Sequence, residues 1–307
     1  MDGILNVNKP SGPTSHDIVA RVRKVTGKKR VGHAGTLDPI ASGVLLVCLG
    51  NATRVVEYLV DWPKSYRTTA VFGAETDTED ETGTVIRERD ASGVTRDLLE
   101  RTLPRFVGEI SQVPPMVSAV RHKGRRLYQL ARAGKVVERA PRTVRIYSLR
   151  LVEFHPGRRA TAVLDVDCSK GTYIRTLCAD IGRSLDCGGH MASLVRTRIG
   201  KFRVEDAVSM DDIERLAASG RLAGAVHPVD EVLHEMPAIE LDAEDSARVV
   251  QGAAVVVAKS AQLPPLGAPV RIHGPGARLL GIGRLDLLPN GHFALKPEKV
   301  FAVGKAE

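Results

Sequence analysis

Three polar side chains that could do chemistry stand close together near the start of the sequence: His33, Thr36 and Asp38. They lie in the stretch GHAGTLDPIASG of residues 32–43, whose other members are mostly small. Small residues let a backbone bend sharply and let a bulky partner come close. Pro39 disfavours a helical conformation at the residue before it. We therefore expect Asp38 to be held at a stiff corner, where its carboxylate could be aimed at a substrate.

Two other interpretations of Asp38 stay open on the residues alone. It could cap a turn that starts a helix, because Asx turns before proline are common. It could also bind a metal ion together with His33, although no third ligand stands at a recognisable spacing. The protein would then be a metal-dependent hydrolase.

Apolar periodicity and capping residues indicate the elements that hold this loop. We expect a strand over 4–10, then a helix capped by Ser15 and ended by Gly27. The acidic run at 75–81 is expected to be mostly a solvated loop, in which Asp80 could still serve an active site. Further helices are expected over 53–60, after a Thr95 cap, from 169–172 through 185 and after a Ser209 cap, with strands over 65–73, 145–154, 160–168 and 194–202.

The pattern changes after Pro228 and Met236-Pro237. A short helix over 243–251, ended by Gly252, is followed by short strands with turns at 274–276 and 289–291. Residues 237–307 are therefore expected to form a compact β-rich module of their own.

The composition excludes several classes of protein. A length of 307 residues, 43% hydrophobic and 26% charged, is typical of a soluble protein with two domains or one large domain and an appendage. No apolar run has the length of a membrane span, and the first residues do not resemble a signal peptide. The four cysteines form no CxxC pair, which favours reduced thiols in a cytoplasmic protein.

The charge points to a polyanionic partner. The net charge is +8, and residues 121–150 hold ten Lys or Arg against a single acid, Glu138. Such clustering fits the neutralisation of phosphates. Aromatic residues make up only 4% of the chain, so extended stacking on single-stranded nucleic acid is not expected.

Several motifs in a fixed order make residues 3–237 resemble the TruB family of tRNA pseudouridine synthases, which isomerise uridine in the T loop of tRNA. Each motif alone is weak, but the series is specific. The matching residues are NKPSGPTS at 8–15, GHAGTLDP at 32–39, GVL at 43–45, GNATR at 50–54, Tyr66, Gly73, TDT at 76–78, GRRLY at 124–128 and SKGTYIRTL at 169–177.

The resemblance implies a fold and a division into domains. The fold class would be α+β, with a mixed, largely antiparallel sheet flanked by helices and a small β-rich C-terminal domain. Residues 1–236 would form the catalytic domain, with a basic thumb-like insert at about 117–143. Residues 237–307 would form a PUA-like RNA-binding domain, a match of pattern rather than of motif.

The resemblance also implies the chemistry. Asp38 would be the catalytic carboxylate, Arg175 would favour its ionised form, and Tyr66 would lie against the uracil and move the proton from C5. The reaction exchanges an N-glycosidic for a C-glycosidic bond within the same nucleotide, so no metal or cofactor is expected. It could proceed by attack on the sugar, addition to the base or proton removal from the ribose.

Further residues would bind the substrate. The target uridine lies inside folded tRNA and must be flipped out, and His33 is the candidate to fill the gap. Tyr173 and Leu194 would line the pocket, although core packing explains them equally well. Arg125 and Arg126 in the insert would contact the T arm. No membrane and no obligate protein partner is expected. The alternative function is an RNA-binding or tRNA-folding chaperone with a vestigial isomerase site.

Overall fold

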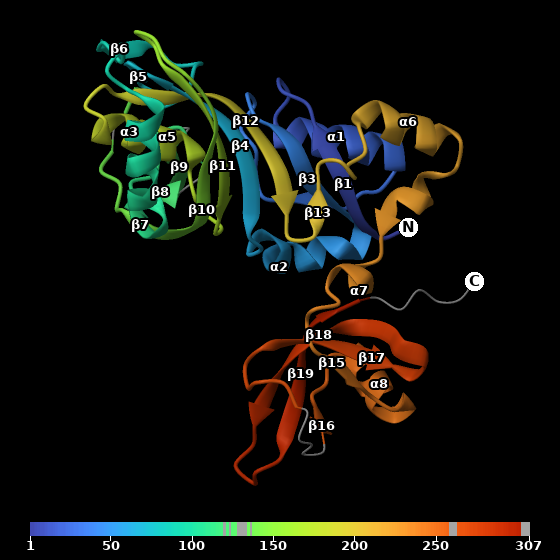
Figure 1. Cartoon of the computed structure of the whole chain (residues 1–307). Coiled ribbons are helices and arrows are strands. Elements are labelled where there is room, and N and C mark those ends of the chain that lie inside the picture. The colour runs from blue at the N-terminus through green and yellow to red at the C-terminus, as the bar shows by residue number, and fades with distance from the viewer. Residues whose placement is uncertain (119–120, 123, 128–133, 136, 258–262, 302–307) are drawn as a thin grey trace.

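A computed structural model of the chain describes residues 1–307 except 119–120, 123, 128–133, 136, 258–262 and 302–307, and describes only the backbone of 121–122 and 125–126 (Figure 1). Two sheets dominate it, the larger in the upper part of Figure 1 and the smaller below it. The predicted α+β fold, with a mixed sheet flanked by helices and a β-rich C-terminal unit, is confirmed.

Ten strands of the described residues form the larger sheet, and its neighbours are antiparallel except for one parallel pair, β3 with β12. The order along the sheet is β14 (Val226–His227), β1 (Gly3–Lys9), β3 (Ser42–Leu49), β12 (Gly189–Ile199), β4 (Lys64–Phe72), β11 (Thr161–Cys168), β10 (Arg142–His155) and β7 (Gly108–Gln112). Two short strands lie off this path: β2 (Val31–Ala34) pairs with β3, and β13 (Phe202–Arg203) pairs with β12.

Both faces of this sheet are covered where β3 runs through it. Since neighbouring side chains of a strand point to opposite faces, its nearly continuous apolar sequence needs two separate partners. Leu45, Val47 and Leu49 share a core with buried side chains of α1 (Ser15–Thr26) and α6 (Met210–Ala218). Val44, Leu46 and Cys48 share another core with the 3₁₀ helix η1 (Gly50–Val55) and α2 (Val56–Val60).

The other half of the sheet is covered on one face only. Strand β11 alternates buried and half-buried positions over its whole length, as its sequence predicts. Its buried side chains share a core with α5 (Ile174–Ser184) and α3 (Arg96–Thr102). The opposite face carries polar side chains such as Ser65, Arg67 and Asp165.

The start of α1 differs from the prediction. Thr14, and not Ser15, is the N-cap: its backbone is extended, its hydroxyl accepts from Asp17 N, and the Asp17 carboxylate accepts from Thr14 N. This capping box leaves the Ser15 hydroxyl free to bond elsewhere. The helix ends at Gly27 as expected, in the left-handed conformation (φ 65°) that glycine adopts most easily.

Most other predicted elements are present, with shifted ends. The caps at Thr95 and Ser209 are confirmed. Of the helix expected over 53–60, only the part from Val56 is α-helical, and the residues before it belong to 3₁₀ helix η1. The strand expected over 194–202 begins at Gly189 and ends at Ile199, because Gly200 (φ 52°) turns the chain back into β13.

The acidic run at 75–81 is only partly a solvated loop. Its start belongs to the small hairpin of β5 (Ala74–Thr76) and β6 (Val85–Glu88). Thr76 and Asp80 are buried. The expectation of a solvated loop is therefore wrong for Thr76, whose hydroxyl donates to Asp80 O, whereas Asp80 was expected to be able to serve an active site.

The smaller sheet has the strand order β15 (Ala238–Glu240), β17 (Pro269–Gly274), β18 (Arg278–Leu287), β19 (Phe293–Val300) and β16 (Val255–Val257). Helix α8 (Ala243–Val250) closes its core, and 3₁₀ helix η4 (Pro275–Ala277) lies at the expected turn. The unit is not separate from the rest, because Ile282 and Phe301 pack with Ile4 and Val232 in one shared core.

The remaining described elements are 3₁₀ helices η2 (Leu103–Phe106) and η3 (Leu222–Ala225), helix α7 (Val229–Val232) and the hairpin of β8 (Arg121–His122) and β9 (Arg125–Arg126). Within the described part of the chain, no helix is long and apolar enough to cross a membrane.

Candidate active site

Asp38 lies in the connection between β2 and β3, at residues 35–41. Strand β3 follows this connection directly, so Asp38 does not cap the start of a helix, and that alternative is wrong. The carbonyl of Asp38 accepts from Ala41 N at 3.1 Å, which makes a tight turn around Pro39. The side chain itself is 37% exposed. The carboxylate is therefore fixed by its backbone and open on one side.

Two side chains from the first elements hold this connection. Ser15 Oγ donates to Leu37 O at 3.1 Å and accepts from Leu37 N at 2.9 Å. Lys9, which is fully buried, donates to Ala41 O at 2.6 Å and more weakly to Pro39 O at 3.4 Å. Burial lowers the pKa of Lys9 to about 8, although the charge of Asp38 acts in the opposite direction. The residues on either side of Asp38 are thus tied to β1 and α1.

Arg175 meets Asp38 across the cavity. Its Nε lies 3.0 Å from Asp38 Oδ2, and its side chain is only 3% exposed. The guanidinium also lies 3.5 Å from Asp80 Oδ2 and donates to Thr78 O at 3.1 Å and Val117 O at 2.7 Å. Arg175 is the second residue of α5, rather than one turn into it, so its side chain extends past the helix start towards the loop. The sequence motif predicted the first of these contacts and none of the others.

Asp80 supports Arg175 from the opposite side. It is 5% exposed, and its Oδ1 accepts from Thr78 Oγ1 at 2.8 Å and from Thr82 N at 3.0 Å. Buried carboxylates are usually satisfied in this way. The structure therefore places Asp80 in the network around Arg175, where it helps to fix the guanidinium.

A cavity of about 210 Å³ contains this pair. Tyr66, Tyr173 and Leu194, all expected at the site, line it together with Asp38 and Arg175. The sequence reasoning missed Lys64 and Arg196, although each stands two residues from a predicted site residue on an alternating strand and therefore on the same face. The full lining is Gly35, Thr36, Leu37, Asp38, Val60, Lys64, Tyr66, Ser118, Lys170, Gly171, Thr172, Tyr173, Ile174, Arg175, Leu194 and Arg196.

The two tyrosines of the cavity have shifted acidity. Tyr66 is 8% exposed, and burial raises its pKa, while the nearby charge of Arg196 acts to lower it. Burial also raises the pKa of Tyr173, which stands at the N-cap of α5. Both phenols are therefore neutral at pH 7, and Tyr66 needs help to give up its proton.

His33 lies apart from this cavity, in strand β2 rather than in a loop. Its ring is 5.5 Å from the ring of His16, edge to face. Burial, with smaller contributions from His16 and Arg196, lowers its pKa to about 4, so it is uncharged at neutral pH. Its buried Nδ1 has no hydrogen-bond partner among the described residues. Residues 1–307, outside the omitted segments, hold no cluster of three or more His, Cys, Asp or Glu that could bind a metal ion with it.

The side chains of Arg125 and Arg126 lie outside the described residues, as do Tyr128 and Arg132 in the basic insert. The backbone of Arg125 and Arg126 forms β9, which pairs with β8. Their predicted contact with RNA stays a prediction.

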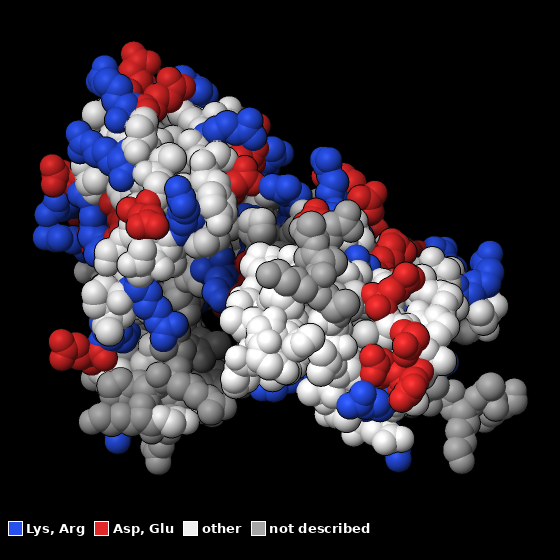
Figure 2. Space-filling view, turned by 90° about the horizontal axis from the view of Figure 1, so that it is seen from below, with Lys and Arg blue, Asp and Glu red and all other residues white. Residues whose placement is uncertain are grey.

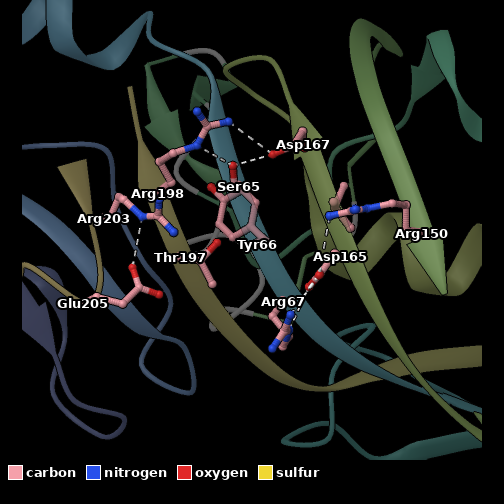
Figure 3. Close-up of a pocket in the computed structure, with 11 residues that line it drawn as sticks. Ser65, Tyr66, Arg67, Arg150, Asp165, Asp167, Thr197, Arg198, Arg203 and Glu205 are labelled. Atoms are coloured by element: carbon pink, nitrogen blue, oxygen red, sulfur yellow. Dashed lines mark hydrogen bonds and ion pairs between the residues drawn. The ribbon is translucent and has the colours of Figure 1, made fainter. Parts of the chain in front are cut away.

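A larger cavity, about 340 Å³, lies on the opposite face of the sheet (Figure 3). Ser65 and Arg67 flank Tyr66 in β4 and therefore point away from Asp38. Arg67 donates two bonds of 2.8 Å to Asp165. Asp167 accepts from Ser65 and, at 2.7 Å, from Ser148. Figure 3 shows these carboxylates occupied by neighbouring arginines and hydroxyls, which leaves the smaller cavity as the better candidate for chemistry.

Family models match nearly the whole chain. One described as "TruB family pseudouridylate synthase (N terminal domain)" matches residues 23–174. One described as "tRNA pseudouridylate synthase B C-terminal domain" matches 175–234. One described as "Pseudouridine synthase II TruB, C-terminal" matches 237–291.

Curated relatives and solved structures agree with these matches. The chain is 49% identical over 257 residues to tRNA pseudouridine synthase B of Symbiobacterium thermophilum, with 84% of each chain covered. It is 42% identical to the protein of that name from Moorella thermoacetica, over 97% of this chain and 98% of the relative. A Cbf5-Nop10-Gar1 complex contains a similar chain (TM-score 0.75, 29% identity, 98% of this chain and 85% of that one). So does an H/ACA RNP bound to a substrate RNA containing 2'-deoxyuridine (TM-score 0.74, 28% identity, 98% and 85%).

Proposed function

Because the chain belongs to the TruB family of pseudouridine synthases, we propose that it converts uridine-55 in the T loop of tRNA to pseudouridine. The observation that carries this proposal is the ion pair of Asp38 and Arg175 inside a cavity that Tyr66 also lines. A protein that only binds RNA has no physical reason to keep a buried arginine aimed at a half-exposed carboxylate, since burying a charge is costly.

In this proposal Asp38 acts as the ionised carboxylate in whichever of the three routes the reaction follows. Arg175 stabilises the negative charge and restricts the carboxylate to one orientation. The orientation matters because a reacting group misplaced by about 1 Å can cost roughly 10²-fold in rate. Lys9 and Ser15 contribute by holding the backbone on either side of Asp38.

Tyr66 would receive the proton that leaves C5 of the uracil once the new carbon–carbon bond has formed. Tyr173 and Leu194 would bind the flipped base in the cavity. Its volume of about 210 Å³ suits a single base with part of its ribose. His33 would fill the space that the base leaves in the RNA. An uncharged ring suits that role, because it can stack without burying a charge.

The RNA would contact the basic insert, including Arg125 and Arg126, and the C-terminal module. We propose that residues 1–236 form the catalytic domain and that 237–307 form a PUA-like RNA-binding domain.

The net charge of +8 supports a polyanionic substrate. Figure 2 shows blue side chains spread over much of the face seen from below, with red ones among them. The proposal includes a cytoplasmic location and no obligate protein partner.

Release of tritium from [5-³H]uridine in a T-arm transcript tests the function directly. The protein should release tritium from a T arm with uridine at position 55 and not from one with cytidine there. Asp38→Asn, which keeps the shape and removes the charge, should reduce turnover to background while binding of tRNA persists. Arg96→Met, which removes an exposed arginine that pairs with Glu100 on the same helix and lies outside the cavity, is the control and should stay close to wild type in the release step.

The alternative is an RNA-binding or tRNA-folding protein with a vestigial isomerase site. It predicts that the wild type binds and refolds tRNA without releasing tritium. Appreciable tritium release by Asp38→Asn would instead support the synthase activity but show that Asp38 is not its catalytic carboxylate.

A further inference from the structure

Among the described residues, Arg196 has the largest side chain that is almost completely buried, at 1% exposed. It stands in β12, where its Cα pairs with Tyr66 of β4 on one side and with Gly43 of β3 on the other. A Cβ atom added to Gly43 would come within 2.3 Å of the Arg196 carbonyl oxygen. Only glycine at position 43 therefore lets β3 and β12 lie close enough for the Arg196 side chain to reach the connection between β2 and β3.

The guanidinium of Arg196 binds the backbone that leads to Asp38. It donates to Gly35 O at 3.0 Å and to Thr36 O at 3.4 Å, and its Nε donates to Val44 O at 2.7 Å. These carbonyls lie before and after the turn that carries the carboxylate. Arg196 thus ties the start of the connection between β2 and β3 to β3 itself, which follows its end.

The charge of Arg196 is not neutralised nearby. No carboxylate of the described residues lies within 4.0 Å of it, whereas buried arginines are usually paired with an acid. Its positive charge affects several groups of the site. It acts to lower the pKa of Lys9, Lys64 and His33 as well as that of Tyr66. A cation that is buried beside a phenol and has no carboxylate partner stabilises an anion there more strongly than it would in water.

The other charged or titratable groups around Tyr66 do not provide the same effect. Asp38 and Cys168 act to raise the pKa of the phenol. Burial raises the pKa of Cys168 itself to about 11, so this thiol is neutral. Lys64 donates to two backbone carbonyls, and Arg175 already faces two carboxylates.

We propose that Arg196 is a positioning residue that fixes the backbone ahead of Asp38 and whose positive charge stabilises the phenolate form of Tyr66. This inference rests on the proposed function for its meaning in catalysis. When the C5–H bond breaks, its electron pair returns to the uracil ring and its proton passes to the Tyr66 oxygen, while N1 gains a proton. Tyr66 must therefore begin this step as the phenolate, and a buried phenol reaches that state only beside a positive charge.

Three variants separate the charge from the hydrogen bonds. Arg196→Lys keeps the charge, Arg196→Gln keeps hydrogen-bond donors without charge, and Arg196→Met keeps neither. Arg198→Met is the matched control. A bulge between Arg196 and Arg198 turns Arg198 to the opposite face, where it bonds Ser65 and lies 3.4 Å from Asp167.

The first readout is the ionisation of Tyr66 in the protein without RNA, measured as the phenolate absorbance that disappears in a Tyr66→Phe background. We expect its midpoint to rise by about one pH unit or more in the Gln and Met variants. It should stay near wild type in the Lys and Arg198→Met variants. Because no RNA is present, this result does not depend on whether tRNA is the substrate.

The second readout is single-turnover tritium release. The Gln and Met variants should lose about 10²-fold or more in rate at neutral pH. Part of this loss should return at higher pH, with little change in tRNA affinity. An unchanged Tyr66 midpoint in folded Gln and Met variants would overturn the proposal. An Arg196→Lys variant that does not fold would also overturn the proposal, because Arg196 would then be needed for its shape and not for its charge.

Discussion

Arg175 combines two functions that the sequence motif does not separate. It pairs with Asp38, and it also bonds the carbonyls of Thr78 and Val117. The second set of contacts ties α5 to the segments on either side of the cavity. A change at Arg175 therefore alters both the charge beside Asp38 and the local packing, and a useful experiment must tell the two apart.

Replacing Arg175 should affect chemistry more than docking. Arg175→Lys should retain some activity, because lysine supplies the charge without the planar fork. Arg175→Met should lower kcat by about 10²-fold or more. Binding of tRNA should change little, because the pair of Arg175 and Asp38 lies inside the cavity.

Kinetics of tritium release across a pH range, with tRNA affinity measured in parallel, checks this prediction. Arg183→Met serves as the control, because Arg183 lies on the same helix, is exposed and pairs only locally with Asp180. Loss of RNA affinity with an unchanged rate of release from bound tRNA would show that Arg175 binds phosphate instead.

The sequence could place Asp38, Tyr66 and Arg175 together only through the family resemblance. Their separations along the chain carry no spatial information without the order of the strands. Arg196 was missed because a basic residue in a strand is ordinarily exposed. Alternation from Leu194 places Arg196 on the cavity face, but its burial depends on the close approach of Gly43 in a distant strand, which leaves no pattern in the local sequence.

At the scale of elements, the connection between β2 and β3 is fixed by side chains from its surroundings. Ser15, Lys9 and Arg196 bond backbone atoms on three different parts of it. The sequence predicted a stiff corner at Pro39, and the structure adds how that corner is fastened. Local residues determine the turn, while its position relative to Arg175 depends on tertiary contacts.

Removing the Ser15 hydroxyl should loosen this connection. Ser15→Ala breaks two bonds to Leu37 and leaves its buried N–H without a partner, which should cost about 1–3 kcal/mol of folding free energy. The thermal midpoint should fall by roughly 2–4 °C for each kcal/mol. The rate of the chemical step should fall about tenfold, as Asp38 is held less firmly.

The matched control for this change is Ser11→Ala. Ser11 is exposed and donates a single bond to Ile40 O of the same connection, so its loss should have a small effect on both measurements. If calorimetry shows a lower midpoint for Ser15→Ala while the rate per folded enzyme stays at the wild-type level, the bonds to Leu37 stabilise α1 but do not position Asp38.

At the scale of the whole molecule, the two sheets are joined by a shared core and by a polar contact. Asp230 Oδ1 in α7 accepts from Arg271 Nη1 and from His273 Nε2 of β17, both at 2.8 Å. Arg271 also donates to Met236 O at 2.9 Å. Hydrogen bonds from β17 therefore reach both α7 and Met236, which lies in the segment that links α7 to the smaller sheet (Figure 1). The sequence indicated a change of pattern here but not this contact, because its partners are about forty residues apart.

Breaking this contact should free the C-terminal module without unfolding it. Asp230→Asn leaves Arg271 half-buried without a carboxylate, which should cost about 1–3 kcal/mol at the junction. Proteases should then cut faster between residues 233 and 242. If the module helps to bind tRNA, affinity should fall while single-turnover release from bound tRNA stays near wild type, because Asp230 lies outside the cavity.

The pH dependence provides an independent check of the same contact. Burial alone would raise the pKa of Asp230, but the bonds from His273 and Arg271 more than offset it and hold the pKa below its usual value. A carboxylate with a lowered pKa stabilises the fold above its ordinary pKa and loses this effect as the pH falls through the lowered value. Below about pH 4, cleavage of the wild type should therefore approach that of Asp230→Asn. Asp245→Asn, which removes only a local pair with Arg248, should follow the wild type throughout. Equal cleavage of all three proteins at neutral pH would mean that the shared core around Ile282 and Phe301 alone holds the module in place.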